Sequence, residues 1–302
     1  MIKSLDHLNL IKVKLFIAVI LFFSISLVQA DFPITSCQSL NSPGTYVLLN
    51  DVTASGTCFT FDADSVTLDC NGHLIDGNNS ASVAVHINGR NGAVLRECLI
   101  ENFTDSTQHS IQIDSSNNVS ILNNVLRNNA GIIGRSFDSR STNILVRGNV
   151  FNSTYVKKVY LPYNITYFQG RGLLGIGDYW TIEDNYFFNT SYTLSSQGPC
   201  PQGEIGWGIL TYGDFATIRN NNLKDNSCGI YLSGSNGLVE NNLIDGTNSI
   251  NEGSGLRSEG NNSIFSGNTF ISASSYFAYP GVFHVQFLNN DFDSFHLSGE
   301  EN

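Results

Sequence analysis

Asp114 and Arg135 are candidates for acid–base chemistry, because each ends a short apolar segment of the same form, 111–114 and 132–135. If the two segments are neighbouring strands, alternation points both side chains outward. A base that takes the proton alpha to a uronate carboxyl, with an acid or a cation that neutralises the enolate, is what a polysaccharide lyase needs. A surface ion pair of little energetic value is the simpler interpretation of the same two residues.

Asp178 and Asp214 are candidates for a metal site, because each follows a glycine at an equivalent point of its segment. Two carboxylates stacked about 4.8 Å apart on neighbouring strands repel each other unless something intervenes. A calcium ion, with turn carbonyls completing an oxygen shell, would remove that repulsion. Two side chains that splay into screening solvent are the alternative. Calcium is the cofactor that the sequence suggests.

Aromatic residues are concentrated in and around two segments, 155–171 and 191–206. Aromatic faces suit the apolar faces of sugar rings, and segments that do not build a scaffold often carry function. The candidate sugar contacts are Tyr163, Tyr167, Trp207 and Tyr212. We expect the two segments to wall a groove whose floor is formed by Arg135, Leu174, Leu210 and Tyr212. A small core within the segments themselves is the alternative use of these aromatics.

The elements that position these residues come from a repeat. One pattern recurs from residue 68 to the C-terminus: an apolar residue, two variable residues, Asn, a variable residue and a second apolar residue. The Asn positions are 124, 149, 185, 221, 242, 268 and 290, and Cys98 occupies the equivalent position in an earlier copy. Recurrence at this spacing indicates a solenoid. We expect the asparagines to make the tight left-handed turns and to hydrogen-bond to one another along the axis.

A second pattern, an apolar strand between two glycines, precedes the first in segments 172–177, 208–213, 229–234 and 255–260. Each repeat therefore holds two or three short strands that alternate between inward and outward residues. A single repeat cannot bury its apolar face, whereas stacked parallel coils can. The sequence predicts an all-β protein, one parallel β-helix of about ten coils over residues 31–302. Residues 32–64 are expected to cap its N-terminal edge.

The composition limits the kinds of partner that the protein can have. Charged residues make up 14% of the chain and leave a net charge of −11, which disfavours nucleic acid as a partner. Residues 1–30 have basic residues followed by an apolar run that is short for a membrane span, and then a small-residue cleavage site. We expect a signal peptide, with no stable membrane span after its cleavage. An uncleaved anchor is the alternative.

The chain has six cysteines, all beyond residue 30, and export would permit disulfides. No two cysteines have the close spacing of a zinc site. Their positions in the coils favour pairing of nearest neighbours. The expected disulfides are Cys37–Cys58, Cys70–Cys98 and Cys200–Cys228.

Residues 37–77, with their two flanking cysteines and the segment from Ser65 to Gly77, resemble the opening of right-handed β-helix domains of the pectin-lyase-like superfamily. The most similar group is the carbohydrate-binding and sugar-hydrolysis type of domain. The resemblance covers the mature chain and implies a right-handed β-helix, a fold that hosts lyases, hydrolases, epimerases, adhesins and scaffolds. The motifs of polygalacturonase-like hydrolases are missing, since Gly72-His73 is followed by Leu74 and no Asp-Asp pair occurs.

These features together predict a secreted or cell-surface protein that binds or processes an extracellular polysaccharide. If the protein is an enzyme, the missing hydrolase motifs favour a lyase. A non-catalytic surface or adhesion scaffold is the alternative function.

Overall fold

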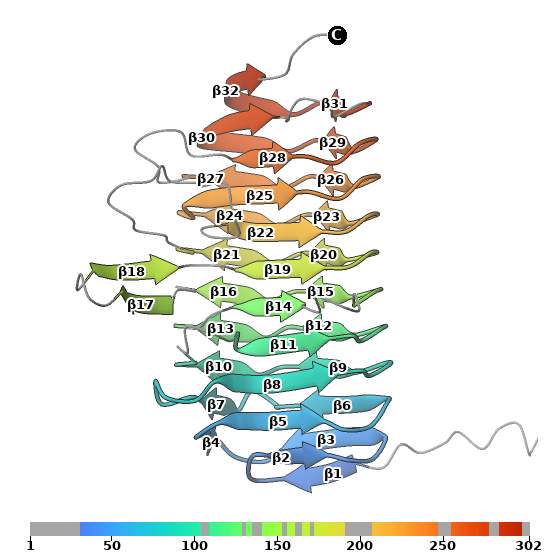
Figure 1. The fold of residues 1–302 in the computed structure, drawn as a ribbon, viewed down its shortest axis with the longest axis vertical. Coiled ribbons are helices and arrows are strands. Elements are labelled where there is room, and N and C mark those ends of the chain that lie inside the picture. Colours follow the sequence, from blue (N-terminus) through green and yellow to red (C-terminus); the bar gives the residue numbers. More distant parts are fainter. Residues whose placement is uncertain are drawn as a thin grey trace, which may run out of the picture. The chain divides into compact units, whose positions relative to one another are not determined.

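The computed structural model describes residues 31–103, 109–128, 131–134, 141–152, 156–160, 165–169, 172–190, 207–246, 255–277 and 284–297. Within these ranges every regular element is a β-strand, and the strands form three large sheets and one hairpin (Figure 1). The expected signal peptide, residues 1–30, lies outside the described residues and stays a prediction. Among the described residues, no helix is long and apolar enough to cross a membrane.

Each sheet takes one strand from each successive coil. The eleven-stranded sheet contains, in order, β1 (Asp31–Ile34), β3 (Gly44–Leu48), β6 (Val66–Asp69), β9 (Val94–Arg96), β12 (Ser120–Leu122), β15 (Leu145–Arg147), β20 (Thr181–Glu183), β23 (Thr217–Arg219), β26 (Leu238–Glu240), β29 (Ile264–Ser266) and β31 (Gln286–Leu288). The ten-stranded sheet contains β4 (Val52–Thr53), β7 (Leu74–Asp76), β10 (Leu99–Glu101), β13 (Val125–Arg127), β16 (Val150–Asn152), β21 (Tyr186–Phe188), β24 (Asn222–Lys224), β27 (Leu243–Asp245), β30 (Thr269–Phe277) and β32 (Asp291–Leu297).

The third sheet carries five of the candidate residues: Asp114, Leu174, Trp207, Leu210 and Tyr212. This nine-stranded sheet contains β2 (Gln38–Leu40), β5 (Thr57–Phe61), β8 (Val83–Asn88), β11 (Ile111–Asp114), β14 (Ile132–Gly134), β19 (Leu173–Ile176), β22 (Trp207–Tyr212), β25 (Cys228–Leu232) and β28 (Leu256–Ser258). Pairing is parallel throughout the ten- and nine-stranded sheets and from β3 to β31 in the eleven-stranded sheet, for example β11 with β8 and β19 with β22. The predicted parallel β-helix is therefore confirmed.

The core fills the inside of the coils because inward side chains alternate with outward ones. In the eleven-stranded sheet, equivalent inward positions of successive coils are all buried: Leu68, Leu95, Ile121, Val146, Ile182, Ile218, Val239 and Phe265. Like side chains also stack along the axis, as the rings of Phe151 and Phe187 do at 4.4 Å between centroids. Each coil thus buries its apolar residues in a core that it shares with its neighbours, which makes the stack cooperative.

The asparagine column forms the hydrogen-bonded ladder that the repeat predicts. From Asn124 to Asn268, each side-chain amide donates to the Oδ1 atom of the next asparagine at 2.8–3.0 Å. The expectation that these asparagines make the left-handed turn is wrong. The preceding residue makes the turn, as exposed Asn123 does with φ of 55°. Because the turn is made there, the buried ladder residue can point its amide inward.

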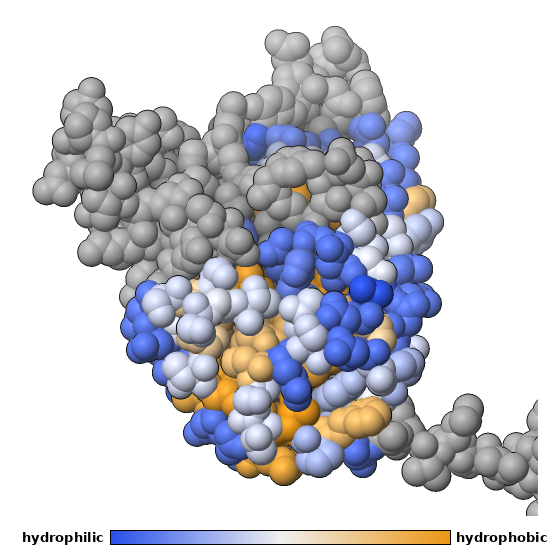
Figure 2. All heavy atoms as spheres, turned by 60° about the horizontal axis from the view of Figure 1, so that its bottom comes forward, coloured by the Kyte–Doolittle hydropathy of each residue, from blue (hydrophilic) through white to orange (hydrophobic). Residues whose placement is uncertain are grey.

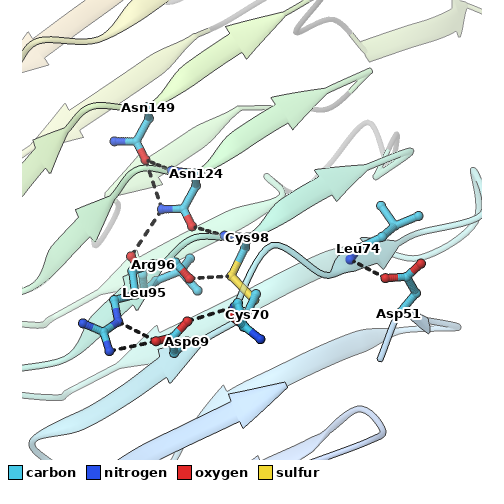
Figure 3. The surroundings of a disulfide bond; sticks show 10 residues. Asp51, Asp69, Cys70, Leu74, Leu95, Arg96, Cys98, Asn124 and Asn149 are labelled. Carbon is cyan, nitrogen blue, oxygen red and sulfur yellow. Dashed lines mark hydrogen bonds and ion pairs between the residues drawn. A yellow bond between two sulfur atoms is a disulfide. The ribbon is translucent and has the colours of Figure 1, made fainter. Parts of the chain in front are cut away.

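Two of the three expected disulfides, Cys37–Cys58 and Cys70–Cys98, are present. Cys98 takes the place of an asparagine: its backbone N–H donates to Asn124 Oδ1 at 3.0 Å, while its side chain bonds to Cys70 on the preceding coil (Figure 3). The disulfide therefore continues the line of the ladder toward the N-terminus. Cys228 is also disulfide-bonded, but its expected partner Cys200 lies outside the described residues, so that pair stays a prediction.

The first coil extends the same three sheets. Its strands β1, β2 and β4 are the edge strands of the eleven-, nine- and ten-stranded sheets. Figure 2 looks onto this end, where hydrophobic residues lie among hydrophilic ones. Leu49, which follows β3, is 52% exposed. The role of residues 32–64 as a cap remains an expectation.

Candidate functional site

Five of the predicted site residues lie in strands of the nine-stranded sheet: Asp114, Leu174, Trp207, Leu210 and Tyr212. The outer face of this sheet is therefore the candidate site. Strand pairing aligns one row of residues across successive coils of this sheet: Thr60, His86, Gln112, Ile133, Leu174, Leu210, Tyr231 and Arg257. The row changes character along the stack. It is polar in the N-terminal coils, apolar in the middle coils, and aromatic and charged in the C-terminal coils.

Asp114 lies in the polar part, where its closest partner is a histidine. His86 Nε2 lies 3.0 Å from Asp114 Oδ2, and Gln112 donates its amide to the same oxygen at 2.7 Å. Both members of the His86–Asp114 pair are partly exposed, so solvent and substrate can reach them. An imidazole oriented by a carboxylate is an arrangement that can accept a proton. Arg135, the expected partner of Asp114, lies outside the described residues.

The middle of the face is closed rather than open. Leu174, Leu210 and Trp207 were expected to floor or line an open groove, but each is only 1% exposed. With Cys228 and Tyr231 they form an apolar cluster separate from the main core. The expectation is wrong because these side chains bury their apolar surface against one another across β19, β22 and β25. The buried indole of Trp207 therefore offers no open stacking face in this structure.

The aromatic and charged part holds a connected group that the sequence analysis did not single out. Tyr231 is its centre: the ring of Trp207 lies 5.2 Å away, that of Tyr212 contacts it edge-on at 5.9 Å, and Arg257 covers it at 5.0 Å. Arg257 Nη2 binds Glu259 Oε1 at 2.6 Å. We call these five residues the Tyr231 cluster. The signal that finds it is the register of the glycine-flanked strands, which places Tyr231 beside Arg257 on the outer face.

Burial and charge shape the electrostatics of the Tyr231 cluster. Burial of the phenol, and then its hydrogen bond to Glu259, raise the pKa of Tyr231 well above the ordinary value. The phenol is therefore a hydrogen-bond donor at neutral pH. The indole Nε1–H of Trp207 is also buried, and no acceptor for it occurs among the described residues. Because an unsatisfied buried donor costs about 1–3 kcal/mol, this atom is a natural place for a ligand or water oxygen.

The two inserted segments are only partly described. In the first, β17 (Val156–Tyr160) and β18 (Ile165–Gln169) form an antiparallel hairpin that projects from the stack (Figure 1). Tyr167 lies in β18, whereas Tyr163 lies outside the described residues. The second segment, 191–206, also lies outside them. The strands that follow the two segments, β19 and β22, are paired neighbours, so both segments return to adjacent coils.

Asp178 and Asp214 lie on successive coils, as expected. Asp178 Oδ1 accepts the backbone N–H of Asp214 at 2.9 Å, and Asp214 Oδ1 accepts that of Ser235 at 2.8 Å. These amide dipoles already offset part of the repulsion between the carboxylates. Among the described residues, no three side chains of His, Cys, Asp or Glu gather as a metal site. Calcium binding at this pair stays a prediction.

The comparisons with known proteins fit this geometry. Residues 207–298 match the family model described as the right-handed β-helix region. The same residues supply the last coils of the three parallel sheets. The chain is a right-handed parallel β-helix protein. No sequence match was found among curated proteins.

Solved structures of other β-helix proteins resemble the chain at low identity. The surface protein and adhesin PfbA of Streptococcus pneumoniae is 11% identical, with 90% of each chain covered and a TM-score of 0.43. The GH136 lacto-N-biosidase of Eubacterium ramulus is 12% identical, with 80% of this chain and 51% of that chain covered and a TM-score of 0.46. The exopolygalacturonase of Thermotoga maritima is 11% identical, with 90% and 75% covered and a TM-score of 0.42.

Proposed function

We propose that this β-helix protein is secreted or held at the cell surface, and that it binds an extracellular polysaccharide on the outer face of the nine-stranded sheet. The observation that carries the proposal is the Tyr231 cluster. It combines aromatic rings with an ion pair and a buried indole N–H that finds no acceptor among the described residues.

The chemistry of the Tyr231 cluster suits a sugar. A pyranose has an apolar face, which packs on an aromatic ring, and a rim of hydroxyls, which donate and accept hydrogen bonds. Tyr212, only partly buried, supplies the aromatic surface nearest to solvent in the cluster, and Glu259 supplies a partly exposed acceptor. Trp207 contributes a donor once a ligand opens or fills the space beside it.

Processing of the polysaccharide is a second candidate, and the His86–Asp114 pair favours it. In a lyase, His86 would take the proton alpha to the uronate carboxyl, and Arg135 or a cation would neutralise the enolate. The reaction breaks the bond to the leaving sugar oxygen and creates a carbon–carbon double bond. Ultraviolet absorbance of that unsaturated product, lost in His86→Ala, would establish this activity.

A non-catalytic surface or adhesion scaffold is the rival function. The buried Leu174 and Leu210 fit a scaffold as well, because their apolar side chains need no ligand. A glycan array with the purified chain, residues 31–302, separates the two functions. Binding of a defined glycan supports the proposal, and a blank array contradicts it.

A further inference from the structure

Tyr179 and Phe215 form an exposed aromatic pair on a different part of the coil from the Tyr231 cluster. Tyr179 lies in the turn from β19 to β20, and Phe215 lies in the turn from β22 to β23. Their rings stack at 4.9 Å between centroids with an angle of 5° between planes. They are 51% and 45% exposed, so neither ring contributes to the core.

The backbone at this turn disfavours aromatic residues. Successive coils place one residue in the left-handed conformation here, with φ of 53–61°: Asn118, Asn143, Tyr179, Phe215, Asn236 and Asn262. Backbone hydrogen bonds link the row from coil to coil; Tyr179, for example, donates its N–H to the carbonyl of Asp214 at 3.0 Å. Asparagine adopts this conformation readily, whereas bulky side chains rarely do. Two aromatics therefore stand, at an energetic cost, where the neighbouring coils use asparagine.

The turn is also held firmly. Asp178 and Asp214, the residues just before the aromatic pair, each accept a backbone N–H from the next coil. A strained residue that is exposed and held in place is typical of a functional site, because the strain persists only where the surroundings fix it. Neither burial nor turn chemistry accounts for the choice of Tyr and Phe at these two positions.

We infer that Tyr179 and Phe215 form a second carbohydrate contact, which takes the apolar face of a neutral sugar ring. Two rings present far less surface than the roughly 1,000 Å² that a stable protein partner needs, so the pair suits a small ring. The flanking carboxylates of Asp178 and Asp214 disfavour an anionic sugar at this pair. The same carboxylates are acceptors for the hydroxyls of a neutral one.

The test introduces asparagine, the residue that the two flanking coils carry at this turn as Asn143 and Asn236. The double variant Tyr179→Asn/Phe215→Asn keeps the left-handed turn and removes the rings. Calorimetric titration with cellohexaose, xylohexaose and mannohexaose, with hexagalacturonate as the anionic comparison, measures binding. We expect at least one neutral hexaose to bind, the double variant to weaken that binding at least tenfold, and its melting temperature to stay at or above that of the wild type. Leu49→Asn, at a similarly exposed apolar residue, is the control and should bind as the wild type does.

Several results would overturn the inference. A lower melting temperature of the double variant, with unchanged sugar binding, would show that the stacked rings of Tyr179 and Phe215 only stabilise the fold. Binding of hexagalacturonate alone, or of no hexaose, would exclude a neutral-sugar contact. Loss of a dimer in the double variant, without a change in sugar binding, would assign the pair to a second copy of the chain. Tyr212→Ala, titrated in parallel, separates this contact from the Tyr231 cluster, because the two sites share no residue.

Discussion

The guanidinium of Arg257 lies 5.0 Å from the ring centroid of Tyr231, its paired residue on the neighbouring strand. The same guanidinium binds Glu259, to which the Tyr231 phenol is also hydrogen-bonded. Three side chains, from β25, from β28 and from the residue that follows β28, thus form one closed unit on the outer face. Because each member fixes the other two, substitutions within the unit should not have additive effects.

Tyr231 should make the stability of the protein depend on alkaline pH. Its folded-state pKa is raised, so the folded state holds the phenol proton where the unfolded state releases it. The contribution of Tyr231 to the free energy of unfolding is fully present below about pH 10, the ordinary tyrosine pKa, and declines as the pH rises further. Urea denaturation at about pH 8 and at about pH 11, on either side of that value, should show a smaller loss of unfolding free energy for Tyr231→Phe than for the wild type. An equal loss of unfolding free energy in the wild type and in Tyr231→Phe would show that Tyr231 does not contribute to the pH dependence.

The asparagine ladder should be a large single contribution to stability. Asn185 donates its amide to Asn221 Oδ1 and to the Val146 carbonyl, and its Oδ1 accepts from Asn149. Asn185→Ala removes these bonds and leaves the buried backbone N–H of Asn149 without its acceptor, and we expect a loss of about 2–4 kcal/mol in the free energy of unfolding. Urea denaturation measures it. Asn128→Gly, at an exposed left-handed turn, is the control and should cost far less.

The disulfide scheme can be checked directly. Peptide mapping without reduction should find Cys37 joined to Cys58, Cys70 to Cys98 and Cys200 to Cys228. The double variant Cys70→Ala/Cys98→Ala opens a loop with a sequence separation of 28, and should lower the free energy of unfolding by about 2–4 kcal/mol. A peptide that links Cys37 to any other cysteine would refute the scheme.

Calcium binding at Asp178 and Asp214 predicts a metal-dependent melting temperature. Calcium should raise the melting temperature of the wild type relative to chelator, because a ligand that binds the folded state stabilises it. Asp214→Asn keeps an oxygen that can accept the Ser235 N–H but removes a charge, so it should abolish the difference. Identical melting temperatures of the wild type with calcium and with chelator would end the hypothesis.

The fold could be predicted because the coils repeat. The Asn124 column and the glycine-flanked strands recur at nearly constant spacing, and alternation within each strand then sorts inward from outward residues. The disulfides Cys37–Cys58 and Cys70–Cys98 followed from the same placement of residues on neighbouring coils. These features could be predicted because the repeat alone determines which residues lie on neighbouring coils.

The candidate site was harder to predict because it depends on packing outside the coil. Alternation places Leu174 and Leu210 on the outer face, but it does not show that they bury one another there. Arg257 and Glu259 are close in the sequence, yet only the register of β25 and β28 brings them to Tyr231. Likewise, the ladder pattern does not reveal that Asn123, rather than Asn124, makes the turn.

Calorimetric titration of the polysaccharide fragment found on the array tests the central claim most directly. The variants are Tyr212→Ala, which removes a partly exposed ring of the Tyr231 cluster, and Tyr186→Ala, a partly buried tyrosine of the ten-stranded sheet. We predict that Tyr212→Ala weakens binding by about 1–3 kcal/mol, as expected for the loss of an aromatic contact, while Tyr186→Ala binds as the wild type does. Equal affinity of all three proteins would contradict glycan binding at the Tyr231 cluster.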